Sequence, residues 1–164
     1  MRKIFTHIAL CLGLYSLNFI SAPIAGALPL PSTKTPEKPL CRIEIDYVHP
    51  STYFRNKGIA AIKVNARSVC DVIQQEVILT VQIFKVGFLF DHLVRSTTTD
   101  ANRPSSTGLR VENNQTSARC KDSKVTKYYG IAFATAVIAG QKVQAPPTRS
   151  IRITTIPCGT GANL

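Results

Sequence analysis

Apolar and polar residues alternate along most of the chain after residue 40. The pattern begins at residues 41–47, where Cys41, Ile43 and Ile45 are separated by charged residues. Successive side chains of a strand point to opposite faces of a sheet, so this alternation predicts a strand with one buried and one solvated face. The same pattern predicts further strands over residues 62–68, 77–83, 88–98, 109–111, 128–139, 143–144 and 151–155.

Residues that favour turns separate these segments. We expect His49-Pro50 to end the first strand, because proline lacks the amide hydrogen that pairing requires. Polar segments that contain glycine, at residues 55–58 and 139–142, are typical of turns between hairpin strands. No segment has a convincing apolar repeat at helical spacing.

These strands and turns predict an all-β fold class. We expect an antiparallel two-sheet sandwich of immunoglobulin-like architecture, with seven or eight short strands and two disulfides. The chain has no tryptophan, so the Cys…Trp…Cys pattern of antibody domains is missing. The comparison therefore concerns architecture alone.

The first 27 residues follow a different pattern. Arg2 and Lys3 precede an apolar run over residues 4–24, which ends at the small residues Ala25-Gly26-Ala27. This layout predicts a secretory signal peptide cleaved between Ala27 and Leu28, and hence a secreted, extracellular protein. The alternative is a retained anchor, but polar residues and Pro23 interrupt the run, so we expect no stable membrane span after cleavage.

The rest of the chain has the size of one domain. Residues 28–39 contain four prolines among polar residues, which predicts an extended tether. We expect residues 40–160 to form a single β-sandwich domain, and residues 161–164 to form a C-terminal tail.

Four cysteines remain after the signal, and in an exported chain they indicate a disulfide framework. Residues equidistant from the centre of an antiparallel hairpin face each other. The midpoints of two cysteine pairs fall at the two predicted turns, which favours the bridges Cys41–Cys70 and Cys120–Cys158. The main alternative is a bridge between sheets, from Cys70 to Cys120. Close ligand spacing such as C-x-x-C is missing, so we expect no metal site.

The chain is strongly basic. It has 20 Lys and Arg residues against 9 Asp and Glu residues, a formal net charge of +11; losing Arg2 and Lys3 with the signal would leave +9. Such a charge favours anionic partners, so we expect an anionic cell-wall polymer, a glycan or an acidic protein surface, and no specific nucleic acid. A modest basic cluster consists of Arg119, Lys121, Lys124 and Lys127.

A second candidate binding site combines aromatic and basic side chains. Tyr53 and Phe54 precede a predicted turn, with Arg55 and Lys57 beside them. Aromatic rings next to cations would suit an anionic sugar or an acidic peptide. The alternative is that these rings pack against the end of the sandwich.

Candidate catalytic groups are sparse. His92 follows Asp91 on a predicted strand, but adjacent strand residues point to opposite faces, and no G-x-S-x-G motif is present. The carboxylates are too scattered for a glycosidase pair or a calcium site. We therefore expect a protein that is not an enzyme and that has no cofactor.

The sequence thus predicts a secreted, non-enzymatic module that associates with a surface. The alternative is a secreted inhibitor of proteases, in which a disulfide-linked scaffold presents one loop. The candidate loop is residues 100–108, where Arg103-Pro104 offers a basic side chain.

Overall fold

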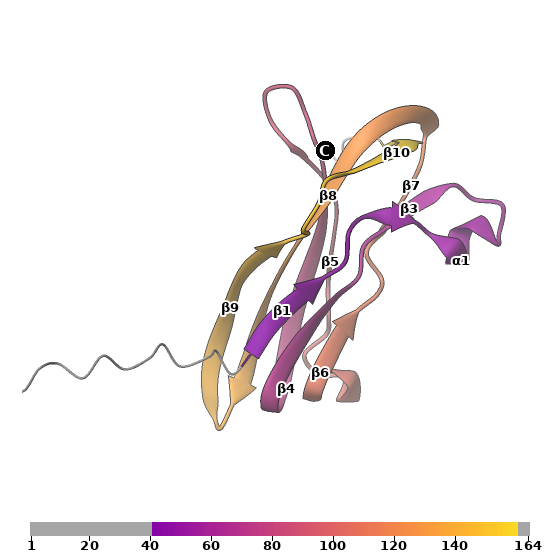
Figure 1. Cartoon of the computed structure of the whole chain (residues 1–164). Coiled ribbons are helices and arrows are strands. Elements are labelled where there is room, and N and C mark those ends of the chain that lie inside the picture. Colours follow the sequence, from indigo (N-terminus) through magenta and orange to yellow (C-terminus); the bar gives the residue numbers. More distant parts are fainter. Residues whose placement is uncertain (1–40, 161–164) are drawn as a thin grey trace, which may run out of the picture. The chain divides into compact units, whose positions relative to one another are not determined.

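A computed structural model describes residues 41–160 and shows that this part of the chain consists almost entirely of antiparallel strands (Figure 1). The predicted signal peptide, tether and C-terminal tail lie outside the described residues, as does residue 40 of the predicted domain. The elements of the described part are, in chain order, β1 (Cys41–Ile45), β2 (His49–Pro50), α1 (Thr52–Arg55), β3 (Ala61–Lys63), β4 (Ala66–Lys85), β5 (His92–Thr98), the 3₁₀ turn η1 (Pro104–Ser106), β6 (Gly108–Asn113), β7 (Ser117–Arg119), β8 (Asp122–Ile138), β9 (Gln141–Arg149) and β10 (Thr154–Gly159).

The strands form two antiparallel sheets. The larger sheet has the order β1-β4-β8-β10, with β5 and β6 also paired to β4, and β9 also paired to β8. The smaller sheet has the order β2-β3-β7. The predicted all-β, two-sheet fold class is confirmed, although the described residues contain ten strands where the sequence predicted seven or eight.

The two strands beyond the eight predicted segments are the short β2 and β7. Strand β4 differs from the prediction in another way, because its 20 residues form one strand that serves two groups of partners. Residues 66–69 lie between β1 and β6, whereas residues 80–85 lie between β5 and β8. The register with β8 shifts between Gln75 and Ile78, around Glu76, whose φ is +50°. This bulge breaks the alternation of apolar and polar residues, so the sequence pattern predicted two strands in place of one.

Both sheets contribute to one hydrophobic core. The alternation predicted in β4 is confirmed, since Val77, Leu79, Val81 and Ile83 are fully buried. They pack with residues of the smaller sheet and with the small face of β8, made of Ala132, Ala134 and Ala136.

The two predicted disulfides are confirmed. Cys41 and Cys70 are direct partners in the register of β1 and β4. Cys120 and Cys158 join the chain just before β8 to β10. In both cases the bridged residues flank segments that pair antiparallel, which is why the distance to the turn identified the partners.

Several predicted strand ends are wrong. The strand predicted over residues 88–98 begins at His92, and the strand predicted over residues 151–155 begins at Thr154. The Ser150 hydroxyl accepts the N–H of Gly130, in place of the backbone carbonyl of a regular ladder, so β9 ends before it.

His49-Pro50 forms the short strand β2, contrary to the prediction that it only ends a strand. This strand pairs with β3 alone, so its other side needs no amide donor. The segment predicted over residues 62–68 is divided between β3 and β4.

Candidate functional site

A pocket of about 380 Å³ brings together residues from both predicted binding sites. Its lining comes from α1, β5 and β7, from the residue just before β8 and from the residue just after β10. The lining residues are Phe54, Val94, Arg95, Ser117, Ala118, Arg119, Lys121 and Thr160. We call this the basic pocket, because three of these residues are cationic.

Arg119 and Lys121 are held on opposite sides of the bridged Cys120. Arg119 is the register partner of Ala61 in β3, and the N–H of Cys120 donates to the carbonyl of Ala60 over 2.9 Å. The N–H of Lys121 donates to the carbonyl of Gly159 over 2.7 Å. The backbone that carries both cations is therefore fixed by hydrogen bonds as well as by the disulfide.

Phe54 supplies the aromatic side of the pocket. It lies in α1, a single turn that closes when the N–H groups of Arg55 and Asn56 donate to Ser51 and Thr52. The guanidinium carbon of Arg119 lies 5.8 Å from the centre of the Phe54 ring, a cation–π distance. This contact orients one cation against an apolar surface.

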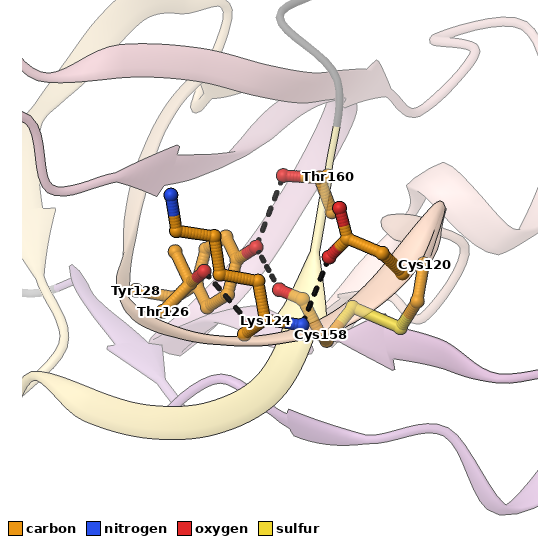
Figure 2. Close-up of a disulfide and its surroundings, with 7 residues drawn as sticks. Cys120, Lys124, Thr126, Tyr128, Cys158 and Thr160 are labelled. Atoms are coloured by element: carbon orange, nitrogen blue, oxygen red, sulfur yellow. Dashed lines mark hydrogen bonds between the residues drawn. A yellow bond between two sulfur atoms is a disulfide. The ribbon is translucent and has the colours of Figure 1, made fainter.

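Thr160 forms a further part of the pocket lining, and its position depends on the buried Tyr128. The Tyr128 hydroxyl donates to the carbonyl of Cys158 and shares a 3.0 Å hydrogen bond with the Thr160 hydroxyl (Figure 2). The side chain of Tyr128 is fully buried. The core and the lining of the pocket are thus linked beside the Cys120–Cys158 bridge.

The charge of the pocket is not balanced by its own residues. None of its lining residues carries a carboxylate. Within residues 41–160, the ion pairs involve other arginines, so Arg95, Arg119 and Lys121 have no acidic partner there. Two hydroxyl groups, of Ser117 and Thr160, add hydrogen-bond donors. This combination suits carboxylate, sulfate or phosphate groups.

The other predicted aromatic and basic residues lie beside the pocket. The Lys57 ammonium donates to the Tyr53 hydroxyl over 2.7 Å and lies 4.3 Å from the centre of its ring. That hydrogen bond lowers the pKa of the Tyr53 hydroxyl. Arg55 lines a separate, more apolar pocket of about 360 Å³ that also contacts Cys120 and Cys158.

Lys124 and Lys127 lie on β8 and do not line the basic pocket. The backbone N–H of Lys124 donates to the carboxylate of Asp122 over 2.9 Å. Its side chain lies on the side of β8 that carries Thr126 and Tyr128 (Figure 2). The predicted cluster is therefore divided, with Arg119 and Lys121 at the pocket and the two later lysines along the strand.

Arg95 belongs to the basic pocket but was missed by the sequence analysis. It lies in β5 and is exposed, so the sequence treats it as one more solvated strand residue. It is separated from Arg119 by 24 positions, and only the folding of β5 beside β7 brings both to one pocket.

Of the two candidate catalytic residues, His92 is exposed in β5 and Asp91 is engaged in other contacts, as is His49, the second histidine among residues 41–160. The Asp91 carboxylate accepts hydrogen bonds from the N–H of Gly87 and from the Tyr129 hydroxyl. The Nδ1 atom of His49 lies 3.0 Å from the carbonyl of Pro50. Among residues 41–160 there is no group of three or more His, Cys, Asp or Glu side chains that could hold a metal ion.

The loop considered for protease inhibition has its own internal hydrogen bonds. The Ser106 hydroxyl contacts the carbonyls of Asp100 and Arg103. Arg103 also lies 3.7 Å from the Asp100 carboxylate, with two thirds of its side chain exposed. The loop is therefore ordered and presents a basic side chain.

No helix in the part of the chain covered by the structure is long and apolar enough to cross a membrane.

Comparisons with known proteins give no relative. No family model matches the chain, and neither the search of curated proteins nor the search of solved structures finds a match.

Proposed function

We propose that this protein is a secreted, non-enzymatic module that binds anionic groups of a surface polymer or glycan in the basic pocket. The observation that carries the proposal is the grouping of Arg95, Arg119 and Lys121 around one pocket without a carboxylate in its lining. The net charge is +11 for the whole chain and would be +9 without Arg2 and Lys3, and such a charge would guide anionic polymers to this surface.

The openness of the pocket favours a polymer over a small metabolite as its ligand. The pocket is open to solvent and its cations are exposed, so a charged group of a chain can enter while its neighbours contact the surrounding basic surface. Lys124 and Lys127 on β8 extend that surface. Several weak, salt-sensitive contacts along one chain together give useful affinity.

Binding to immobilised dextran sulfate, measured across a salt series with neutral dextran as the control polymer, tests the proposal. We expect the variant R119Q to bind at least about tenfold more weakly, because it loses one charge-assisted contact. The matched control is K142Q, which removes the same charge from the start of β9. Equal losses in both variants, or no binding at low ionic strength, would contradict the proposal.

Protease inhibition is the second candidate function, favoured by the internal hydrogen bonds of the loop at residues 100–108. In this case Arg103 would enter the specificity pocket of a trypsin-like enzyme. An inhibition assay distinguishes the two functions, since R103Q would abolish inhibition and leave the binding of dextran sulfate unchanged.

A further inference from the structure

The loop between β4 and β5 presents three consecutive apolar side chains to solvent. Phe88 is fully exposed, and Leu89 and Phe90 are each 77% exposed. Figure 1 shows the loop projecting beyond the ends of the two strands that it joins. Apolar side chains exposed in this way contribute favourable free energy only when a partner covers them and removes them from water.

The loop is held in this conformation by specific contacts. A Cβ atom at Gly87 would lie 1.8 Å from the carbonyl oxygen of Phe90, so only glycine fits the close approach of the backbone there. The N–H of Gly87 donates to one oxygen of Asp91, whose other oxygen accepts from the Tyr129 hydroxyl over 2.9 Å. The base of the loop is therefore fixed while its apolar tip is left uncovered.

The ring of Tyr129 is itself fixed on the sheet. It stacks on Phe84, with ring centres 5.3 Å apart, and the Arg149 guanidinium carbon lies 3.8 Å from its centre. Desolvation, followed by the hydrogen bond to Asp91, raises the pKa of the Tyr129 hydroxyl, which therefore stays a neutral donor.

Basic residues lie on the two strands next to the base of the loop, β4 and β8. Lys85 ends β4 opposite Tyr128, and β8 extends past this point toward Asp122, so Lys124 and Lys127 lie at the end of the sheet that carries the loop. The N–H of Val86, at the start of the loop, donates to the carbonyl of Lys127 over 2.9 Å.

The acidic residues at this end do not cancel that charge. Asp91 is bonded to the loop and to Tyr129, and Asp122 accepts the N–H of Lys124. Lys85, Lys124 and Lys127 outnumber these two carboxylates.

We propose that this loop docks the protein on an anionic lipid bilayer, with Phe88, Leu89 and Phe90 inserted among the headgroups and upper acyl chains. An apolar tip framed by lysines matches the two layers of such a surface, an apolar interior beneath negative charge. A projecting tip also suits insertion better than it suits a flat protein interface. The lipid site is separate from the basic pocket and does not depend on the binding of polymers there.

The test is co-sedimentation of the protein, exported by an expression host, with vesicles of phosphatidylcholine that contain about one third phosphatidylserine. Replacing the tip in the variant F88S/L89S/F90S should weaken binding by at least about 100-fold, because three apolar side chains no longer enter the bilayer. The matched control is I151S, since Ile151 is equally exposed but lies between β9 and β10. It should bind like the original protein.

The charge contribution is tested separately. The variant K124Q/K127Q should bind these vesicles about tenfold or more weakly, and the original protein should bind vesicles of phosphatidylcholine alone far less tightly than the anionic ones. Equal binding to both vesicles would contradict the role of the lysines.

A spectroscopic measurement locates the contact. Because the chain has no tryptophan, the variant F88W places a single indole at the tip of the loop. Its fluorescence should shift to shorter wavelength when anionic vesicles are added. An unchanged spectrum, or tip variants that bind vesicles normally, would overturn the proposal. So would a dimer formed without lipid and lost in F88S/L89S/F90S, because a second copy would then be the partner of the loop.

The two proposals can fail independently. If F88S/L89S/F90S loses the vesicles and still binds dextran sulfate, the loop is the lipid site and the basic pocket is intact. If R119Q no longer binds dextran sulfate but still binds the vesicles, the basic pocket is the polymer site and the lipid site is intact.

Discussion

At the scale of single residues, Tyr128 links the core of the protein to the basic pocket. Its ring is fully buried, and its hydroxyl contacts both the carbonyl of Cys158 and the hydroxyl of Thr160. A buried hydroxyl is tolerated because it is hydrogen-bonded, and removing it leaves the carbonyl without that donor.

The variant Y128F should therefore lower the free energy of unfolding by about 1–3 kcal/mol, measured by urea denaturation. It should also weaken the binding of dextran sulfate, since Thr160 loses its partner. The control is Y53F, which removes a hydroxyl that is bonded to Lys57 on an exposed side chain. A similar loss of stability in both variants would argue against the role given to Tyr128.

Glu44 makes stability depend on pH. Its pKa is lowered, first by the hydrogen bond from Arg67 and then by that from Arg42. The folded state therefore binds a proton at Glu44 more weakly than the unfolded chain does. The resulting stabilisation is present above the ordinary pKa of 4.5 and is lost as the pH falls through the lower pKa of the folded state.

We expect the thermal midpoint of the protein to fall below about pH 4.5, and the variant E44Q to show a smaller fall over the same range. The fall should persist in part in E44Q, because the pKa of Glu112 is also lowered, first by the hydrogen bond from Asn114 and then by that from Arg110. Protonation of Glu112 therefore also destabilises the folded state at acid pH. A steeper acid dependence in E44Q than in the original protein would contradict this assignment.

At the scale of elements, the alternation of residues predicted most strands correctly but not their ends. The run from Val77 to Ile83 has one buried face, and that is what period-two patterns report. The bulge at Glu76 depends on pairing with distant strands, so the local pattern could not show that β4 continues through it. Phe88 and Phe90 keep the phase of a strand, although no sheet faces them.

The basic pocket was predictable only in part for the same reason. Arg119 and Lys121 lie next to a cysteine whose pairing the spacing of the turns identified, and Phe54 stood out as an aromatic residue in a turn. Arg95 gave no signal of its own, because its place at the pocket depends on how β5 lies beside β7.

The Cys120–Cys158 bridge should matter more for binding than the Cys41–Cys70 bridge. Replacing either pair by alanine should cost about 3–4 kcal/mol of stability on the chain-entropy model, since the bridges close loops of similar length. Only C120A/C158A should also lower the affinity for dextran sulfate under conditions where both variants fold, because Cys41 and Cys70 do not line the basic pocket. Equal affinities in the two variants would contradict this.

At the scale of the whole molecule, the described part of the chain combines a rigid scaffold with two uncompensated surface features. Two disulfides and one core shared by both sheets fix the strands. On this scaffold the basic pocket lacks carboxylates in its lining, and the loop between β4 and β5 exposes an apolar tip. Both features are unfavourable to leave uncovered, which is why we assign them to partners outside the chain.

The most direct test of the central claim is an NMR titration of isotope-labelled protein with a short sulfated oligosaccharide. We predict that the amide signals of Arg95, Ser117, Arg119 and Lys121 shift together and saturate at one affinity. Shifts confined to other surfaces, or no shifts at low ionic strength, would show that the basic pocket does not bind anionic polymers.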